Sequence, residues 1–225
     1  TVIVNWSLNN ALQTPFTLTN PLGVSGGTGV NERNVTLGNM TLTGPVTLKI
    51  WTSNANNTID PNPANDTLTL ALNPAMGGNY TINSAAPASA TNFQTITAFT
   101  DALNARGVCA PVVATIAPGS GPYTGKVTFG NITGASASNT IRLLGNGNTV
   151  NVATTATAGT KEMLLLTGAK YVTVDSINFV STSTVGGWGA LVMNNSQYDS
   201  IIRCKFDLSS VTATASASNS GIMIQ

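Results

Sequence analysis

The stretch MLLLTGAKYVTVDSINF, residues 163–179, aligns without a gap on ALVMNNSQYDSIIRCKF, residues 190–206, at an offset of 27 residues. Three of the aligned pairs are identical: Leu164 with Leu191, Tyr171 with Tyr198 and Phe179 with Phe206. A repeat of this length without an internal helix is typical of a β-solenoid, in which each turn stacks its side chains on the same types one turn away. The repeat therefore predicts a parallel β-helix.

Two weaker matches extend this repeat in both directions. Residues 141–145 align on 164–168 at an offset of 23, and residues 221–224 align on 190–193 at an offset of 31. Fixed strands joined by loops of variable length account for the spread of offsets. Alternating apolar and polar segments predict the strands, at 112–117, 126–129, 140–144, 149–152, 163–167, 171–174, 177–180, 190–193 and 201–206.

One helix is expected in front of the solenoid, over residues 93–107. Apolar residues recur there at helical spacing, Thr91 or Asn92 can cap the start, and Gly107 can end the helix. A solenoid end exposes an open core and unpaired strand edges, so this amphipathic helix is suited to cap one end. The Pro- and Gly-containing segment before it, 75–92, is expected to be a linker.

Residues 1–74 are expected to form a separate β-sandwich. Alternating segments predict strands at 2–6, 34–37, 46–51 and 67–72, with turn-forming clusters between them. Four or five strands are few for a sandwich. We therefore expect further strands to precede Thr1 in a longer parent protein, and further coils to follow Gln225.

The composition excludes several classes of protein. Charged residues make up 8% of the chain, the net charge is +1, and there is no histidine. So small a net charge produces too weak an electrostatic field to attract nucleic acid or anionic lipid. No apolar run approaches the roughly 20 residues of a membrane span. Without histidine, Ser-His and Cys-His nucleophile pairs and His-ligated zinc are excluded.

The two cysteines lie on distant turns of the predicted solenoid. At about 4.8 Å per turn, Cys109 and Cys204 are much farther apart than the roughly 6 Å between the Cα atoms of a disulfide. We expect both to be unpaired. Cys204 shares strand parity with Ile202 and Phe206, so all three are expected to point inward.

A cluster of hard oxygen ligands is the one candidate metal site, for calcium: Asp60, Asn62, Asn65 and Asp66. Carboxylate and amide oxygens at loop spacing are ligands that Ca²⁺ prefers. The same residues also suit an Asx turn that fixes the loop between two strands, and the two neighbouring prolines favour this turn. No other cofactor is expected.

Catalysis by a solenoid enzyme of the lyase or hydrolase type would need clustered or paired carboxylates. The alignment pairs each carboxylate with an aliphatic residue on the neighbouring turn: Asp175 with Ile202, Asp199 with Val172 and Asp207 with Val180. No catalytic residue is therefore expected in this segment.

The aligned tyrosines predict a stacked ladder, for which a packing role is favoured over a role as a sugar-binding platform. An ice-binding face is disfavoured, because the outward hydroxyls are irregularly spaced.

A family resemblance rests on short motifs along the whole chain. The segments GNYTIN (78–83), FQTI (93–96), LNARGV (103–108), PVV (111–113), GASASNTI (134–141) and GAKYVTVD (168–175) resemble right-handed, pectin-lyase-like β-helix domains of very large surface proteins of Bacteroidota. Upstream, VNWSLN (4–9), KIWTS (49–53) and NPANDT (62–67) resemble the Ig-like modules that precede such β-helices.

The resemblance completes the expected fold class: all-β, with a partial Ig-like β-sandwich over 1–74 followed by a right-handed parallel β-helix over 108–225 and an N-terminal capping α-helix. It implies secretion, often by the type IX pathway, and display outside the bacterial outer membrane. The implied role is adhesion, including gliding-motility adhesion, toward surface polysaccharide or another cell-surface ligand. Two alternatives stay open: a polysaccharide lyase or hydrolase with its active site beyond residue 225, and a self-assembling surface filament.

Overall fold

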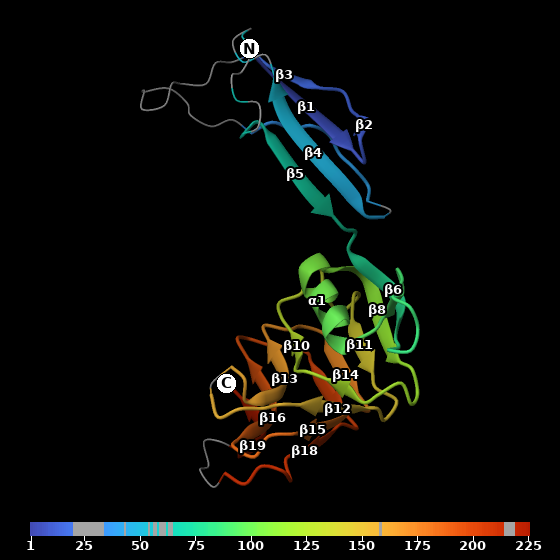
Figure 1. Cartoon of the computed structure of the whole chain (residues 1–225), viewed down its shortest axis with the longest axis vertical. Coiled ribbons are helices and arrows are strands. Elements are labelled where there is room, and N and C mark those ends of the chain that lie inside the picture. The colour runs from blue at the N-terminus through green and yellow to red at the C-terminus, as the bar shows by residue number, and fades with distance from the viewer. Residues whose placement is uncertain are drawn as a thin grey trace. The chain divides into compact units, whose positions relative to one another are not determined.

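The computed structural model describes residues 1–19, 34–42, 44–53, 55, 58, 62, 65–157, 159–213 and 219–225 of the chain. The chain divides into two compact units, Thr1–Pro74 and Ala75–Gln225, each of which is considered by itself (Figure 1). Within the described ranges, the regular elements of both units are strands, apart from one short helix in the second. Among the described residues, no helix is long and apolar enough to cross a membrane.

The first unit contains one antiparallel sheet in the order β2-β1-β4-β5, with β3 also paired to β1. Its strands are β1 (Val2–Leu8), β2 (Ala11–Leu12), β3 (Phe16–Leu18), β4 (Val46–Ser53) and β5 (Thr67–Leu72). The strands expected around 2–6, 46–51 and 67–72 are confirmed. The strand expected at 34–37 is wrong, because those residues have no ladder partner. Within the described part of this unit there is one sheet, and an Ig-like sandwich is not shown.

The second unit is a parallel β-solenoid of about five turns, with three sheets. The first sheet contains β17 (Ser200–Ile202), β14 (Val172–Asp175), β11 (Ile141–Leu144), β8 (Val108–Ile116), β6 (Met76–Ile82) and β7 (Asn92–Phe93). The second contains β18 (Lys205–Asp207), β15 (Asn178–Ser181), β12 (Thr149–Val152) and β9 (Tyr123–Thr124). The third contains β10 (Val127–Phe129), β13 (Glu162–Thr167), β16 (Gly187–Met193) and β19 (Asn219–Ile224). Each full turn visits the three sheets in the same order.

The aligned repeat corresponds to neighbouring turns, but its register is corrected in the third sheet. Phe179 pairs with Phe206, as predicted, and their rings stack with centroids 5.1 Å apart. Leu164, however, pairs with Ala190 and not with Leu191. The turn after β16 contains one residue more than the turn after β13, so the offset changes from 26 to 27 between the third and the first sheet.

The two weaker matches also need correction. Residues 141–144 pair with 172–175 in the first sheet, whereas 164–167 belong to the third sheet, so the offset of 23 compares strands on different faces. The strands of all three sheets carry aliphatic residues at their inward positions, so the similarity of short segments did not distinguish one sheet from another. In the last turn Ile222 pairs with Ala190, which makes the offset 32 instead of 31.

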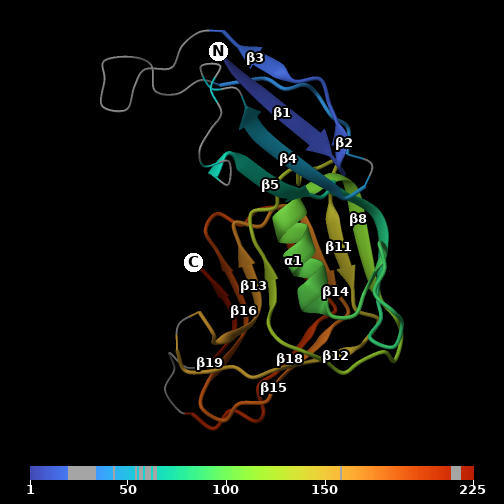
Figure 2. The same ribbon diagram turned by 45° about the horizontal axis from the view of Figure 1, so that its top comes forward.

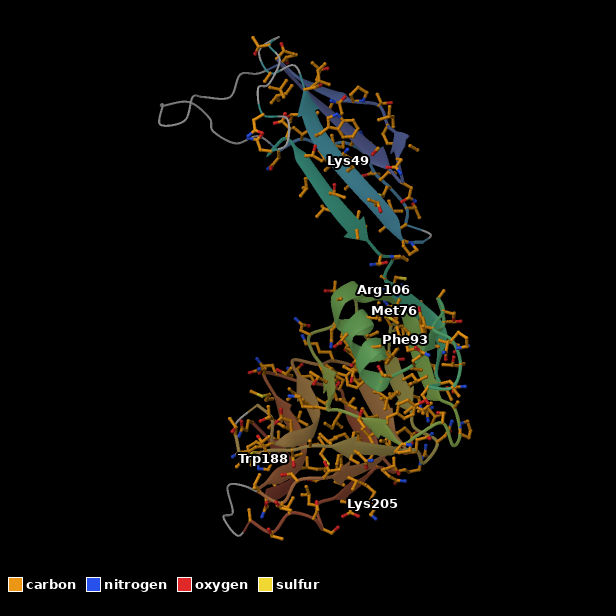
Figure 3. The ribbon with its side chains drawn as sticks, viewed as in Figure 1. Lys49, Met76, Phe93, Arg106, Trp188 and Lys205 are labelled. Carbon is orange, nitrogen blue, oxygen red and sulfur yellow. The ribbon has the colours of Figure 1, made fainter. Side chains whose placement is uncertain are left out.

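The segment 75–92, expected to be a linker, instead belongs to the solenoid. It contains β6, which pairs in parallel with β8 along most of its length. Met76 and Ile82 on this strand are fully buried. Figure 3 shows Met76 and Phe93 together at the helix-bearing end of the unit. Gly77 and Gly78 therefore lie within a core strand, which begins two residues after Pro74.

The helix α1 (Ile96–Arg106) covers one end of the solenoid and packs against β6, β7 and β10 (Figure 2). It begins at Ile96 and not at residue 93, because Asn92–Phe93 pairs with β6 as β7. The cap is accordingly Thr95, whose hydroxyl accepts a hydrogen bond from the Ala98 amide at 3.0 Å. Gly107 ends the helix at a φ of 68°, as expected for a left-handed C-terminal residue.

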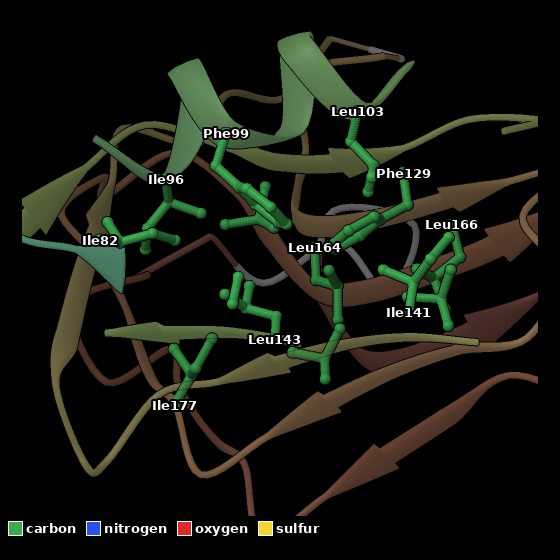
Figure 4. Close-up of a cluster of buried hydrophobic side chains, with 14 of the residues drawn as sticks. Ile82, Ile96, Phe99, Leu103, Phe129, Ile141, Leu143, Leu164, Leu166 and Ile177 are labelled. Atoms are coloured by element: carbon green, nitrogen blue, oxygen red, sulfur yellow. The ribbon is translucent and has the colours of Figure 1, made fainter. Parts of the chain in front are cut away.

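The core runs along the inside of the coil and continues beneath the helix. Ile96, Phe99 and Leu103 on α1 are buried, and they lie over Ile82 and Phe129 from the first turns (Figure 4). Further in, aliphatic residues of successive turns stack upon one another. Helix and strands therefore share one core, which holds the outward-facing side chains on a rigid frame.

Candidate functional site

A groove of about 480 Å³, lined by apolar surface and several polar groups, crosses three successive turns of the solenoid. Its walls come from the strands β9 and β12, the first residue of β13, and the segments that follow β9, β12 and β15. Its polar lining comes from Thr124, Lys126, Asn151, Thr160, Glu162 and Thr182. Because the turns stack in register, hydroxyl, amide and charged groups far apart in sequence are brought into one groove.

An ion pair lies in this groove. The Lys126 ammonium is 2.9 Å from Oε1 of Glu162 and also donates a hydrogen bond to the Gly159 carbonyl at 2.8 Å. Lys126 directly precedes β10 and Glu162 begins β13, and these two strands are neighbours in the third sheet. The pairing of the strands therefore sets the pairing of the charges.

The second carboxylate oxygen of Glu162 has no hydrogen-bond partner. The Glu162 side chain is only 1% exposed, and its Oε2 atom is buried and unpaired. A buried polar atom without a partner costs about 1–3 kcal/mol, and a charged one costs more. Oε2 is therefore an unsatisfied acceptor just behind the wall of the groove, and a ligand hydroxyl or amine can meet it only when the Glu162 side chain turns toward the groove.

An aromatic ring lies on the next turn. Trp188 pairs with Glu162 in the ladder between β13 and β16, and the Lys161 ammonium lies 5.0 Å from the centre of its ring. Trp188 also carries a buried indole N–H without an acceptor. Trp188, Leu165 and Leu191 line a second depression of about 310 Å³ that shares Glu162 with the groove.

A second cluster of charges lies on the outward face of the first sheet. Asp175 is fully buried, and its carboxylate accepts hydrogen bonds from Arg142, Arg203 and the Ser176 hydroxyl. Arg142 comes from one turn before Asp175, and Arg203 from one turn after it. The hydrogen bond from Arg142, assisted by those from Ser176 and Arg203, lowers the pKa of Asp175 from 3.8 to about 2.

The candidate calcium ligands are brought together only in part. Asp60 lies outside the described residues. The Asn65 amide donates to the Asn62 carbonyl at 3.4 Å, and the Asp66 carbonyl accepts from the Thr52 amide at 3.4 Å. Both are backbone contacts, and the second ties the loop to β4. Among the described residues, no three His, Cys, Asp or Glu side chains gather closely enough to hold a metal ion.

The prediction that both cysteines are unpaired is confirmed, whereas the inward orientation expected for Ile202 is wrong. Cys109 is exposed, Cys204 is half-buried against the core, and both are free. Burial raises the pKa of the Cys204 thiol. Ile202 points outward and not inward, because Arg203 has a φ of 50° and this bend divides the expected strand 201–206 into β17 and β18.

The predicted tyrosine ladder is confirmed. The rings of Tyr171 and Tyr198 stack with centroids 4.8 Å apart and planes 12° from parallel. Sequence reasoning missed the Arg142–Asp175–Arg203 cluster because it compared only directly opposite residues, and long side chains reach diagonal neighbours. It missed the groove because Lys126 and Glu162 are 36 residues apart, which is more than the period of the repeat.

The fold and the groove together define a parallel β-helix protein with a cleft across its turns. Comparisons of the chain with protein-family models, with curated proteins and with solved structures found no match.

Proposed function

We propose that this chain is part of a large secreted bacterial surface protein, an adhesin of the gliding-motility type, whose β-helix binds surface polysaccharide outside the outer membrane. The β-helix fold is compatible with such a role. The observation that carries the proposal is the unpaired, buried Oε2 atom of Glu162 in the wall of a groove that crosses three turns. In this proposal the antiparallel sheet of residues 1–74 is one layer of an Ig-like module.

The chemistry of the groove suits the hydroxyl groups of a sugar. When the Glu162 side chain turns toward the groove, a sugar hydroxyl can donate to its carboxylate, and the hydroxyl oxygen can accept from the Asn151 amide or from threonine hydroxyls. A nearby aromatic face, such as that of Trp188, gives a sugar ring an apolar surface. A few convergent polar groups beside apolar surface are the usual composition of a ligand site.

The proposal is binding and not catalysis, because Glu162 is the single carboxylate among the described residues of the groove. Glycoside hydrolysis in most families uses two carboxylates, one on each side of the scissile bond. A lyase or hydrolase centre belongs instead to the alternative in which the active site lies beyond residue 225.

One observation favours self-assembly as the second candidate. The last strand, β19, is paired to β16 on one side, and its Ile222 and Ile224 side chains are 53% and 79% exposed. An unpaired strand edge with apolar side chains is a template for another strand. A second copy of the chain, or further turns of the parent chain, would pair with this strand edge. Concentration-dependent light scattering of the purified chain separates filament growth from a stable monomer.

The groove is tested by the substitution Glu162→Gln, which keeps the shape of the side chain and removes its charge. We expect the wild-type chain to be retarded in affinity electrophoresis by at least one gel from a panel of dextran, mannan, xylan and β-glucan, and the variant to lose at least about tenfold in affinity. Asp207→Asn, which removes a carboxylate outside the groove, is the matched control and should bind as wild type. Circular dichroism checks that both variants fold. No retardation by any gel, or equal binding by Glu162→Gln, would refute the role of the groove.

A further inference from the structure

The arginine cluster on the first sheet contains more positive charge than its carboxylate can neutralise. Asp175 is in contact with two guanidinium groups, so the cluster has one cationic charge in excess. One arginine would be enough to pair a single buried carboxylate. The second is notable in a chain with 8% charged residues and a net charge of +1.

Both arginines keep donors available to solvent. The side chains of Arg142 and Arg203 are 45% and 65% exposed, whereas Asp175 lies fully buried between them. Arg142 uses Nη2 toward Asp175, and Arg203 uses Nε and Nη2. A guanidinium has five N–H donors, so each arginine retains N–H groups beyond those bound to Asp175.

The carboxylate also holds the two guanidinium groups in place. An arginine side chain loses much rotamer freedom when it binds a ligand, and groups that are already ordered bind with a smaller entropic cost. Asp175 holds the guanidinium groups of Arg142 and Arg203 from neighbouring turns, and the Ser176 hydroxyl accepts a further hydrogen bond from Arg203. The cluster is therefore organised before any ligand arrives.

Hydroxyl groups extend the cluster along the solenoid axis. Arg142 is paired with Thr173 in the ladder, and Thr173 is paired with Ser200 on the following turn. These three outward positions form a row with a spacing of about 4.8 Å per turn. The guanidinium groups can bind an oxyanion of an extended polymer, and the row of hydroxyls can form hydrogen bonds to the units next to it.

We propose that Arg142 and Arg203, held by Asp175, form a binding site for an oxyanion group of an acidic polysaccharide. Planar guanidinium forks bind carboxylate and sulfate oxygens through paired, charge-assisted hydrogen bonds. The site lies on the first sheet and shares no residue with the groove. The inference therefore stands independently of the proposed function of the groove.

The test compares three polymers with one backbone: dextran, carboxymethyl-dextran and dextran sulfate. We expect calorimetry at low salt to show binding to at least one of the two anionic polymers and none to dextran at this site. Stronger binding to carboxymethyl-dextran would assign the site to carboxylates, and stronger binding to dextran sulfate would assign it to sulfate esters. Absence of binding to both would overturn the proposal.

A matched pair of substitutions separates the site from general attraction of charge. Arg203→Gln and Lys205→Gln each remove one exposed positive charge within two residues of each other, and Lys205 interacts with Asp207 instead. We expect Arg203→Gln to weaken binding about tenfold, the loss of one charge-assisted contact, and Lys205→Gln by less than about twofold. Equal weakening by both would show unspecific attraction and overturn the site.

A second variant keeps the test valid if Arg203→Gln fails to fold, which circular dichroism would reveal. Arg142→Gln leaves Arg203 and its two hydrogen bonds to Asp175 in place. It should also weaken binding about tenfold, since the site needs both forks. Unchanged affinity in folded Arg142→Gln would contradict a two-arginine site. Glu162→Gln should leave this binding unchanged.

Discussion

Asp175 shows how a single carboxylate can depend on the turns before and after it. Its pKa is lowered to about 2, mainly by the hydrogen bond from Arg142, so the ionised form stabilises the folded state above the unfolded pKa of 3.8. That contribution is lost as the pH falls through about 2. We expect Asp175→Asn to lower the free energy of unfolding by about 1–3 kcal/mol near neutral pH, the usual value of charged hydrogen bonds.

The pH dependence of this difference is the decisive measurement. Urea unfolding of the wild type and of Asp175→Asn should differ at about pH 7 and at about pH 4 but converge toward pH 2, where about half of the wild-type carboxyl groups in the folded state are protonated. A difference that stays constant down to pH 2 would mean that the amide disturbs packing and that the charge is unimportant.

The contacts of single residues could be predicted from the sequence where identical side chains lie on neighbouring turns. The tyrosine and phenylalanine ladders follow from the repeat alone, because identical side chains on neighbouring turns stack. The Arg142–Asp175–Arg203 cluster and the Lys126–Glu162 pair join unlike residues across different offsets. Such pairs produce no periodic pattern in the sequence, so they can be identified only when the strand pairing between turns is known.

At the scale of elements, alternation located the strands but not their limits. A one-residue insertion in the turn after β16 raises the offset from 26 in the third sheet to 27 in the first and second sheets that follow. The turn accommodates it with Asn194 and Asn195, both at positive φ. Asparagine tolerates this conformation better than most residues. An ungapped alignment cannot show such an insertion, and the helix start was misplaced because a short strand precedes it.

The helix cap gives a prediction at this scale. The Thr95 hydroxyl accepts the Ala98 amide, one of the donors that a helix start leaves unpaired. We expect Thr95→Ala to lower the free energy of unfolding by about 1 kcal/mol, which corresponds to a few degrees in melting temperature. Thr97→Ala, inside the helix, is the matched control and should be neutral or slightly stabilising, because alanine is the better helix former. Equal effects in thermal melts would contradict the assignment of Thr95 as the cap.

At the scale of the whole solenoid, each turn is stabilised by its two neighbours, so stability should vary along the axis. The first turns share a core with α1, and the strands of the middle turns are largely buried. The strands of the last turn, β17, β18 and β19, contain no fully buried residue. In a nearest-neighbour array, such a turn opens at a lower free energy than those inside it.

Amide hydrogen exchange measures this gradient directly. We expect the slowest exchange in β11 and β14, faster exchange in β17, and the same decrease in protection from β13 through β16 to β19. The paired amides of one sheet are the proper comparison, because their hydrogen bonds are alike and only their distance from the exposed turn differs. Uniform protection in all turns would mean that the solenoid opens as a single cooperative unit. Protection restored in β19 at high protein concentration would instead show that a second copy pairs with this edge.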